Sequence, residues 1–580
     1  MTGVAFTPTD EQRKVIRYAG SAFVSACPGA GKTRVLIERA RALLQSDRTG
    51  RGVAFLSFTN AAVSELEMRL RQGALLPSPP FPHFIGTFDS FLWQFMIAPL
   101  GVPGCMVPPH LIPDKDDRTV RPFEKARDLP LGCFDRGSGE IIPAIAQRLN
   151  FDPAAKPAVT KAYVTAARNA RERFLARGEL DFADVRSIAK THLQNPDLSS
   201  RLGAALAARF REVIVDEAQD CNPADLEIIE WLRTASIIMK VICDPHQSIY
   251  AFRGGVSEQL IAFGETFPAN ARLSMSGNFR SSDHICKAIV TLRAKDARTV
   301  VDQALGDYRT ESTPIHILAY PGTSVPATIG TKFHELILAL NVDVADCPVL
   351  AATKASGAKA IGQPIDSATQ DSTLRLAMAV TAFHFASEMG NRKAALEEVH
   401  RVILEIEGRI GAQTYHQYLK EEDIGPDVWR PRILHFVRQL RYDPTLYANA
   451  EAWHARAKEL IAPQLPAGGA SINQRLPRNV KLATALAVPR SSIPTARTIH
   501  AVKGMEFPAV CVVMTARYAK GIIDYLVSGQ PTIHAEDSRE IYVAASRAQR
   551  LLVMAVPKSQ ANRLAAHLGS SGAQITLIAL

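Results

Sequence analysis

The sequence lacks the cysteine patterns that bind metals. Its eight cysteines are scattered along 580 residues, and no two form a Cys-x-x-Cys pair. This excludes the common zinc sites and the cysteine-held iron–sulfur clusters. Scattered thiols are typical of proteins that stay reduced, so they predict a cytoplasmic protein.

Long hydrophobic runs are also missing. The sequence has no run of about 18 apolar residues, the length that spans a bilayer, and its first residues, MTGVAFTPTDEQRK, lack the apolar core of a secretory signal. It contains no internal repeat and no low-complexity tract. With 47% hydrophobic and 21% charged residues, the composition is that of a globular protein. We expect it to be soluble and intracellular, with no membrane interaction.

Acidic residues are in the minority. The formal net charge is +10 and the pI is near 9.2. The excess gathers between residues 475 and 520, where eight Lys and Arg residues stand against one acid, Glu506. Such a stretch is typical of a surface that follows the phosphates of a nucleic acid. The alternative is an ordinary solvated surface.

Length and hydrophobic pattern together predict several domains, two of them α/β. A prior of roughly 150 residues per domain gives about four units. Short apolar runs alternate with helical patterns, as in parallel sheets buried on both faces. They form two groups, one before residue 270 and one after about 310, which predict two α/β domains. The runs are SAFVSA, GVAFLSF, EVIVDEA and IIMKVICD, and then CPVLAAT, PAVCVVM and RLLVMAV.

Two segments with a helical pattern interrupt these groups. The first follows a Pro- and Gly-rich loop near residue 100 and contains TKAYVTAARNARERFLARG. The second runs from about residue 365 to 490 and contains STLRLAMAVTAFHFASEM and NRKAALEEVHRVILEIEGRI. Their period is that of amphipathic helices. We expect two mainly helical inserts whose methionines and aromatic rings pack in cores.

The stretch SACPGAGKT, residues 25–33, predicts a nucleotide site. An apolar strand enters it and a helix leaves it, so backbone amides and the positive end of the helix dipole would face the phosphates. Lys32 can reach the β and γ oxygens, and the Thr33 hydroxyl can hold Mg²⁺. Ala26 departs from the usual pattern, which begins with glycine, and the alternative is a chance glycine-rich turn. The residues assigned to ATP here are Ala26, Cys27, Pro28, Gly29, Ala30, Gly31, Lys32, Thr33 and Arg34.

A pair of acids ends the apolar run in FREVIVDEAQD. We expect Asp216 to hold Mg²⁺ together with Thr33. Glu217 would orient and deprotonate the attacking water. Adjacent acids at a strand end also occur on solvated surfaces, which is the alternative.

Further motifs occur in the order of one protein family. DEAQD, CDPHQSIYAFRGG and GNFRSS resemble motifs of the superfamily 1A DNA helicases of the UvrD, PcrA and Rep type. FTPTDEQRKVI looks like the Q motif of that family, and LSFTNAAVSEL, IGTFDSF and GELDFADV are similar to other segments of its first motor domain. TIHAVKGMEFPAV and REIYVAASRAQRLLVM resemble its last two motifs. The resemblance spans residues 6–556.

This resemblance implies an α/β fold with two RecA-like P-loop motor domains, each with a parallel sheet and a mainly helical insert. The first motor domain would comprise residues 1–100 and 181–270, with its insert at 101–180. The second would comprise 271–364 and 491–580, with its insert at 365–490. The second insert is shorter than is usual in the family, so such a protein would translocate well and separate strands with help.

The resemblance also implies roles at the ATP site. Gln12 would read the adenine edge, and Phe279, where the family usually has Tyr, would stack on the base. Glu506 would contact the ribose. Arg280 and Arg547 would act as fingers on the γ-phosphate, with a surface salt bridge as the alternative for each. The implied catalytic set is Lys32, Asp216, Glu217, Gln247, Arg280 and Arg547, in which Gln247 couples the γ-phosphate to DNA.

DNA contacts follow from the same resemblance. Phe58, Tyr250 and Phe252 would stack on bases of a single strand, with core packing as the alternative for Phe58 and Phe252. Asp89 stands where the family usually has His, so that contact is not carried over. The residues implied to contact phosphates or sugars are Thr59, Asn60, Thr87, Arg253, His500 and Lys503.

The implied function is an ATP- and Mg²⁺-dependent 3′-to-5′ translocase and helicase on single-stranded DNA or a single-strand/duplex junction, in DNA repair, recombination or anti-phage defence. The alternative is a nucleotide-gated DNA sensor or a helicase-like subunit that activates a partner nuclease. In length and architecture the chain also resembles the helicase subunit of Gabija-type anti-phage systems, whose partner is an OLD-family nuclease. The sequence has no residue set of the RecB nuclease type, so DNA cleavage would require a partner.

Overall fold

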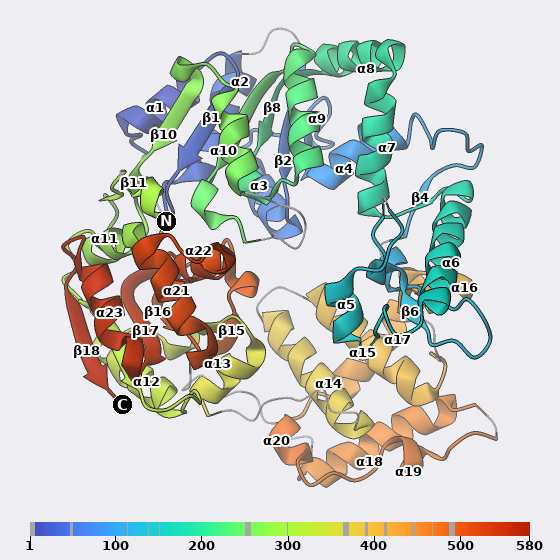
Figure 1. Ribbon diagram of the computed structural model, residues 1–580. Helices are drawn as coiled ribbons and strands as arrows, with labels where there is room; N and C mark the ends of the chain where they lie inside the picture. The colour runs from blue at the N-terminus through green and yellow to red at the C-terminus, as the bar shows by residue number, and fades with distance from the viewer. Residues whose placement is uncertain are drawn as a thin grey trace. The chain divides into compact units, whose positions relative to one another are not determined.

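The computed structural model describes residues 6–46, 50–112, 114–136, 138–149, 151–249, 257–298, 300–362, 371–388, 392–410, 415–443, 447–466, 468–486 and 494–580. The chain divides into two compact units (Figure 1). Unit 1 comprises Met1–Gly104, Phe182–Ile365 and Ser491–Leu580, and unit 2 comprises Cys105–Asp181 and Asp366–Arg490. None of the helices in the described ranges has the length and apolar character needed to cross a membrane.

Unit 1 contains two six-stranded parallel sheets. The first, with the elements around it, is called the first half of unit 1, and its strand order is β10-β1-β9-β8-β2-β3. Its strands are β1 (Ala22–Ala26), β2 (Gly52–Ser57), β3 (Phe84–Thr87), β8 (Phe210–Val215), β9 (Ile238–Cys243) and β10 (Arg272–Met275). Its helices are α1 (Asp10–Arg17), α2 (Lys32–Ser46), α3 (Asn60–Gln72), α4 (Phe88–Leu92), α7 (Phe182–Gln194), α8 (Pro196–Arg209), α9 (Pro223–Thr234) and α10 (Ser257–Glu265).

Two neighbouring residues of β1 pack against different helices of the first half. Val24 packs in one cluster with Leu36 of α2. Phe23 lies edge-on to Phe263 of α10, with ring centroids 6.3 Å apart. Because side chains of a strand alternate between faces, helices cover both faces of this sheet.

The second sheet, with its surrounding elements, is the second half of unit 1. Its strand order is β15-β14-β16-β17-β13-β18, and all neighbouring strands are parallel. Its strands are β13 (Ile315–Tyr320), β14 (Val349–Ala351), β15 (Ala496–Thr498), β16 (Phe507–Val513), β17 (Ala548–Pro557) and β18 (Ile575–Ala579). Its helices are α11 (Asp283–Thr291), α12 (Thr328–Ala339), α13 (Lys354–Ala360), α21 (Ala516–Ser528), α22 (Ala535–Ala545) and α23 (Lys558–Gly569), and a short pair of strands, β11 (Gly277–Asn278) and β12 (Gln303–Ala304), precedes the sheet.

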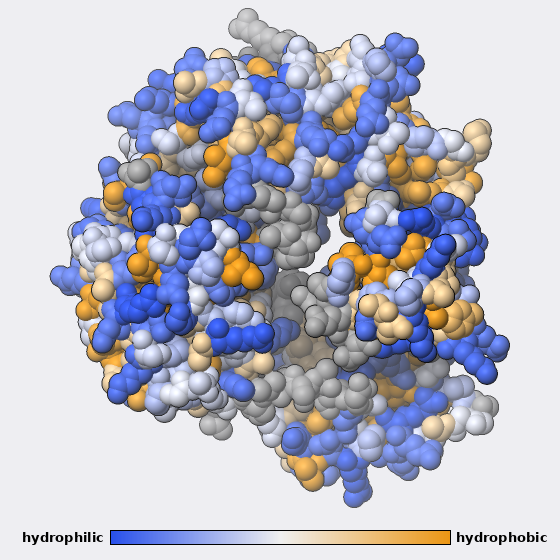
Figure 2. Space-filling view, in the orientation of Figure 1, coloured by the Kyte–Doolittle hydropathy of each residue, from blue (hydrophilic) through white to orange (hydrophobic). Residues whose placement is uncertain are grey.

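This sheet is also covered on both faces. Val512 of β16 packs in the cluster that contains Ile523 of α21, whereas Val513 packs in the cluster that contains Phe333 of α12. Apolar side chains therefore concentrate inside, and Figure 2 shows polar and apolar residues interspersed over the face in view. The predicted α/β fold with two parallel sheets is confirmed, and each apolar run named from the sequence overlaps a strand.

Among the described residues of unit 2, two separate clusters are buried. One contains Tyr163 of α6 (Pro157–Ala176). The other contains Trp453, whose indole Nε1 donates to the Leu440 carbonyl at 2.7 Å. Its helices are α5 (Pro143–Arg148), α6 (Pro157–Ala176), α14 (Ser372–Glu388), α15 (Arg392–Glu407), α16 (Tyr415–Glu421), α17 (Pro426–Gln439), α18 (Ala450–Ile461), α19 (Ile472–Arg475) and α20 (Leu482–Leu486). Its strands have two residues each and are β4 (His110–Leu111), β5 (Thr119–Val120), β6 (Leu129–Pro130) and β7 (Glu179–Leu180).

Candidate nucleotide and DNA site

Residues 27–31 form the loop that joins β1 to α2. Gly29 and Gly31 have φ angles of 70° and 73°, in the left-handed region that glycine adopts without a steric penalty. Gln12 of α1 is buried, and its side-chain Nε2 donates to the Ala30 carbonyl at 3.0 Å. The loop is thus held in place at the positive end of α2, where backbone amides can bind phosphate.

β11 of the second half brings Asn278 and the residues after it to this loop. The Phe279 N–H donates to the Gly29 carbonyl at 2.9 Å. A Cβ placed on Gly29 would lie 2.4 Å from Asn278 Oδ1 and 2.6 Å from the Cβ of Arg280. Phe279 itself is 37% exposed. The structure therefore places Phe279, which is partly exposed, beside the loop of residues 27–31.

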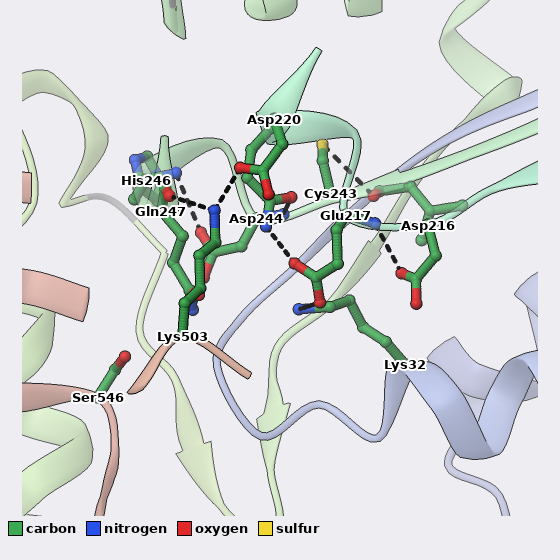
Figure 3. Close-up of polar contacts among 12 residues, drawn as sticks. Lys32, Asp216, Glu217, Asp220, Cys243, Asp244, His246, Gln247, Lys503 and Ser546 are labelled. Atoms are coloured by element: carbon green, nitrogen blue, oxygen red, sulfur yellow. Dashed lines mark hydrogen bonds and ion pairs between the residues drawn. The ribbon is translucent and has the colours of Figure 1, made fainter. Parts of the chain in front are cut away.

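Lys32 and the two acids after β8 lie on one side of the loop (Figure 3). Lys32 Nζ is 3.8 Å from Glu217 Oε1. The Asp216 N–H donates to the Leu56 carbonyl of β2 at 2.8 Å, and Asp216 Oδ1 accepts the Glu217 N–H at 2.9 Å. Glu217 has a φ of 54°, a conformation that costs a non-glycine residue about 1–2 kcal/mol. Strained backbone of this kind concentrates at functional sites.

The two acids differ in their readiness to ionise. Burial, together with the neighbouring Glu217 carboxylate, raises the pKa of Asp216 to about 7. Burial acts on Glu217 in the same direction, but Lys32 and Lys503 outweigh it and lower the pKa of Glu217. Burial disfavours the ammonium of Lys32, yet the adjacent carboxylates raise its pKa. At neutral pH the site therefore contains an ionised Glu217 carboxylate beside a charged Lys32 ammonium group.

Gln247 and Arg547 connect the two halves of unit 1. The Arg547 guanidinium donates to Gln247 Oε1 at 2.7 Å, and burial together with Arg280 lowers the pKa of Arg547 to about 9. Arg280 donates to Glu506 Oε2 at 2.8 Å and to the Ser546 carbonyl at 2.9 Å.

These arginines lie close enough to the P-loop site to affect its charges. Arg547 lowers the pKa of Glu217, and Arg280 opposes the rise in the pKa of Lys32. The structure therefore gathers the predicted catalytic residues of both halves at one place.

Three of the predicted DNA residues lie at helix starts of the first half. Thr59 caps α3, with its hydroxyl oxygen accepting the Ala62 N–H at 3.2 Å. Thr87 caps α4 in the same way, accepting the Ser90 N–H at 3.1 Å. Asn60 is the exposed first residue of α3. Each hydroxyl thus stabilises a helix N-terminus, the end of a helix that favours anions.

Phe58 lies between core and surface. Its ring stacks on the fully buried Phe88 with centroids 5.5 Å apart, so core packing holds one face of the ring. Asp89, which stands in place of the family's His, forms an ion pair with Arg186 at 2.7 Å. Tyr250, Phe252 and Arg253 lie outside the described residues.

His500 and Lys503 of the second half make contacts with the first half. His500 Nε2 lies 3.2 Å from the Ile249 carbonyl. Lys503 Nζ forms an ion pair with Asp220 and lies 3.4 Å from the Gln247 carbonyl (Figure 3). Only 9% of the Lys503 side chain is exposed. In this arrangement both predicted DNA contacts are engaged by protein groups.

Sequence reasoning missed three polar residues that support the site. Asp244 Oδ2 accepts a hydrogen bond from Gln247 Nε2 at 2.9 Å, and the Asp244 N–H donates to Gln219 Oε1 at 3.0 Å. Gln219 also donates to Glu217, and Tyr542 donates its hydroxyl hydrogen to Asp244 Oδ2 at 3.3 Å. All three lie inside motifs that resemble those of the family, namely DEAQD, CDPHQ and REIYVAASRA. Their position in these motifs was the sequence signal that could have identified them.

Known proteins resemble the chain over the same regions. Residues 8–101 and 140–268 match the UvrD/REP helicase N-terminal domain, and residues 485–559 match the UvrD-like helicase C-terminal domain. The putative ATP-dependent DNA helicase YjcD of Bacillus subtilis is 25% identical over 329 residues, which are 54% of this chain and 41% of that protein. The ATP-dependent DNA helicase Rep of Escherichia coli is 26% identical over 300 residues, 49% of this chain and 43% of Rep.

A further relative is the ATP-dependent DNA helicase UvrD1 of Mycobacterium tuberculosis, 27% identical over 306 residues that cover 50% of this chain and 39% of UvrD1. Each alignment thus covers less than half the length of the relative. The first match contains Lys32, Glu217 and Gln247, and the second contains Glu506 and Arg547, whereas Phe279 and Arg280 lie between the two matched regions. The chain belongs to the UvrD-like helicase family of superfamily 1A.

Proposed function

We propose that this chain hydrolyses ATP and uses the free energy to move along single-stranded DNA from 3′ to 5′, separating strands at a junction. The observation that carries the proposal is the hydrogen bond between Arg547 and Gln247, which joins the two halves at the P-loop. A catalytic site completed by groups from two halves is assembled or broken when the halves move, and this links hydrolysis to motion. The two halves would be motor domains, with inserts at residues 101–180 and 365–490.

ATP would lie against the P-loop of the first half. Lys32 and the amides of residues 26–34 would bind the β- and γ-phosphates, and the buried Gln12 would read the adenine edge. The exposed ring of Phe279 is available to stack on the base. Glu506 of the second half, whose side chain is 52% exposed, would contact the ribose.

Hydrolysis would use Glu217 as the general base. Its lowered pKa keeps it ionised, so it can accept a proton from a water that attacks the γ-phosphorus while ADP leaves. Arg280 and Arg547 would stabilise the charge that develops on the γ-phosphoryl oxygens. Gln247, held between Asp244 and Arg547, would sense whether that phosphoryl group is present.

Thr33 and Asp216 fit a magnesium ion. Both offer hard oxygen ligands, and Mg²⁺ is usually held by one or two carboxylates together with substrate phosphates. The raised pKa of Asp216 is that of a buried carboxyl that a bound cation would ionise. When bound, the ion neutralises charge on the β- and γ-phosphate oxygens.

DNA would run across both halves. Asn60 and the helix starts capped by Thr59 and Thr87 would contact phosphates of the first half, and Phe58 would stack on a base. The predicted stacking and phosphate roles of Tyr250, Phe252 and Arg253 are retained. His500 and Lys503 would contact the strand from the second half, with a DNA phosphate replacing Asp220 as the partner of Lys503. Since Lys503 lies beside Gln247, DNA binding would reach the ATP site through this contact.

The test is the rate of ATP hydrolysis with and without single-stranded DNA. We expect strong stimulation by DNA, abolished in Lys32→Ala and Glu217→Gln, while Glu217→Gln still binds ATP. A rate indifferent to DNA would refute the motor proposal. A 3′-overhang duplex should be unwound in preference to a 5′-overhang duplex, and stimulation without unwinding would reduce the proposal to a translocase.

The alternative is a nucleotide-gated DNA sensor, or a helicase-like subunit that activates a partner nuclease of the OLD family and unwinds little DNA of its own. It predicts tight binding of ATP and DNA with slow turnover even when both are saturating. The intact set of Glu217, Gln247, Arg280 and Arg547 favours hydrolysis, because a purely binding module needs none of these groups.

A further inference from the structure

A buried chain of polar side chains leads from Asp302 to Arg547. Arg293, which follows α11, donates to Asp302 Oδ2 at 2.5 Å and to the Tyr542 hydroxyl oxygen at 3.3 Å. Tyr542 of α22 donates to Asp244 Oδ2 at 3.3 Å. Beyond Asp244 the chain continues to Gln247 and then to Arg547. We call these six residues the Asp302–Arg547 chain.

Burying the charged groups of this arrangement costs free energy. Arg293, Asp302, Asp244 and Tyr542 are each less than 5% exposed, and removing a charge from water is unfavourable unless a partner compensates it. The Asp302–Arg547 chain contains two acids and two arginines, so these four charges balance. Within the part of the chain that the structure describes, Asp302 Oδ1 accepts no hydrogen bond. A buried ion pair of this kind is a poor source of stability compared with apolar packing, which points to a role in positioning.

The direction of the hydrogen bonds is fixed at one end. Arginine has donors and no acceptor, so the Tyr542 oxygen must accept from Arg293 and its own hydrogen is left for another partner. The Asp244 carboxylate, which accepts only, takes that hydrogen. Arg293 therefore determines where the Tyr542 hydroxyl hydrogen points.

The same logic fixes the amide of Gln247. Asp244 Oδ2 requires a donor, so it holds Gln247 Nε2 at 2.9 Å and leaves Oε1 facing Arg547. A flipped amide would present its NH₂ group to the guanidinium, and two donors cannot bond to one another. Asp244 Oδ2 thus accepts a hydrogen bond from Tyr542 of the second half and one from Gln247 of the first, while Asp244 Oδ1 accepts the His246 N–H at 3.0 Å.

We propose that Arg293, Asp302 and Tyr542 are positioning residues for ATP hydrolysis: they hold Asp244, which orients the Gln247 amide and so places the Arg547 guanidinium at the γ-phosphate. This inference rests on the proposed ATP hydrolysis at this site. None of the three positioning residues is expected to touch the nucleotide. Their loss would therefore slow the chemical step and leave binding of ATP nearly unchanged.

The most conservative test is Tyr542→Phe, which removes one hydroxyl. With saturating single-stranded DNA, we expect kcat to fall about tenfold, because one lost hydrogen bond to a charged group raises a barrier by that factor. KM for ATP should change by less than about twofold. The matched control is Tyr320→Phe, because Tyr320 is equally buried in the second half and its hydroxyl donates to the Met514 carbonyl at 2.8 Å. The control should keep the kcat of the unmodified protein.

A second variant separates positioning from folding. Arg293→Met combined with Asp302→Leu removes one charge of each sign, so the remaining chain stays balanced and the fold should survive, as judged by Tm. We expect the same fall in kcat as in Tyr542→Phe. A properly folded double variant with normal kcat would overturn the proposal.

A double-mutant cycle with Gln247→Ala shows whether the effect passes through Gln247. In that background Tyr542→Phe should cause no further loss, since the amide to be oriented is gone. Effects that multiply would show that Tyr542 acts elsewhere and would overturn the proposal. If the unmodified protein hydrolyses no ATP with DNA present, the proposed function itself fails, an outcome distinct from a normal rate in active variants.

Discussion

The Arg547 guanidinium donates a hydrogen bond to the side-chain oxygen of Gln247 at 2.7 Å, although the two residues are 300 positions apart in the chain. The contact makes Arg547 part of the site formed around the P-loop, and Arg547 is almost fully buried there. Glu217 and Lys32 lie within electrostatic reach of the arginines of the second half. The proposed ATP site is therefore shared by both halves of unit 1.

Removing the guanidinium should slow hydrolysis far more than it weakens ATP binding. For Arg547→Ala we expect kcat to fall by about 10³ or more, the contribution typical of an arginine finger, with a much smaller change in KM. Arg550→Ala is the matched control, because Arg550 lies three residues further and pairs with Glu311 at 3.0 Å. Steady-state kinetics of both variants check the prediction, and equal losses in the two would contradict it.

Gly29→Ala should damage the site through a clash. The substitution places a methyl group 2.4 Å from Asn278 Oδ1 and forces a left-handed φ of 70° on alanine. Gly322→Ala, at a φ of 68° with no heavy atom within 4 Å of the new Cβ, carries the backbone strain without the clash. We expect about 1 kcal/mol of destabilisation in Gly322→Ala.

In Gly29→Ala we expect, in addition, ATP binding weakened at least roughly tenfold, because the loop and the Asn278 segment must separate. Titration calorimetry with ATP and thermal unfolding measure the two effects. ATP binding at normal strength in Gly29→Ala would show that the contact seen here is unimportant for the nucleotide.

Lys503→Ala should alter how DNA affinity depends on salt. If Lys503 leaves Asp220 to contact a phosphate, its loss reduces the slope of log K against log salt by about 1. Fluorescence anisotropy with a labelled single strand at several salt concentrations gives that slope. Lys332→Ala is the control, since this lysine pairs with Glu335 on α12 at 2.6 Å, and it should leave the slope unchanged. An unchanged slope in Lys503→Ala would remove Lys503 from the DNA interface.

Glu540 should make stability depend on pH. Burial, with the nearby Asp537 and Glu536, raises its pKa from 4.5 to about 7. Because the folded state then binds more protons than the unfolded state, this contribution is present below about pH 4.5 and is lost as pH rises through 7. After solvent screening, its size is on the order of 1 kcal/mol.

The Glu540→Gln variant should flatten that part of the profile. The measurement is the free energy of unfolding of the variant and of the unmodified protein from about pH 4.5 to 8, compared as a difference. Glu335→Gln, at an exposed position of α12, is the control. A difference that does not change with pH would refute the assignment.

Much of the fold was accessible from local sequence. The run SAFVSA predicted the strand found at Ala22–Ala26, and the Gly-rich loop after it leads into α2 as expected. Edge strands were harder to predict, because β10 (Arg272–Met275) is short, alternates polar and apolar residues, and pairs on one side only. The periodicity of a buried central strand is strong, whereas that of a short edge strand is weak.

Contacts distant in sequence were less accessible. Motif order indicated that Lys503 and Arg547 come to the site, but nothing in the sequence shows that Lys503 pairs with Asp220 in this arrangement. The Arg293–Asp302 pair lies outside every quoted motif, so no pattern pointed to it. The family's His is replaced by Asp89, which was visible from the sequence, while its partner Arg186 appears only in the structure.

The most direct test of the central claim is ATP-driven release of streptavidin from biotinylated single-stranded DNA. A motor that moves from 3′ to 5′ should accelerate release from a 5′-biotin and leave a 3′-biotin occupied, and Glu217→Gln should give no acceleration at either end. Faster release from the 3′ end would contradict the proposed polarity. No acceleration at either end, with ATP and DNA bound, would contradict the motor itself.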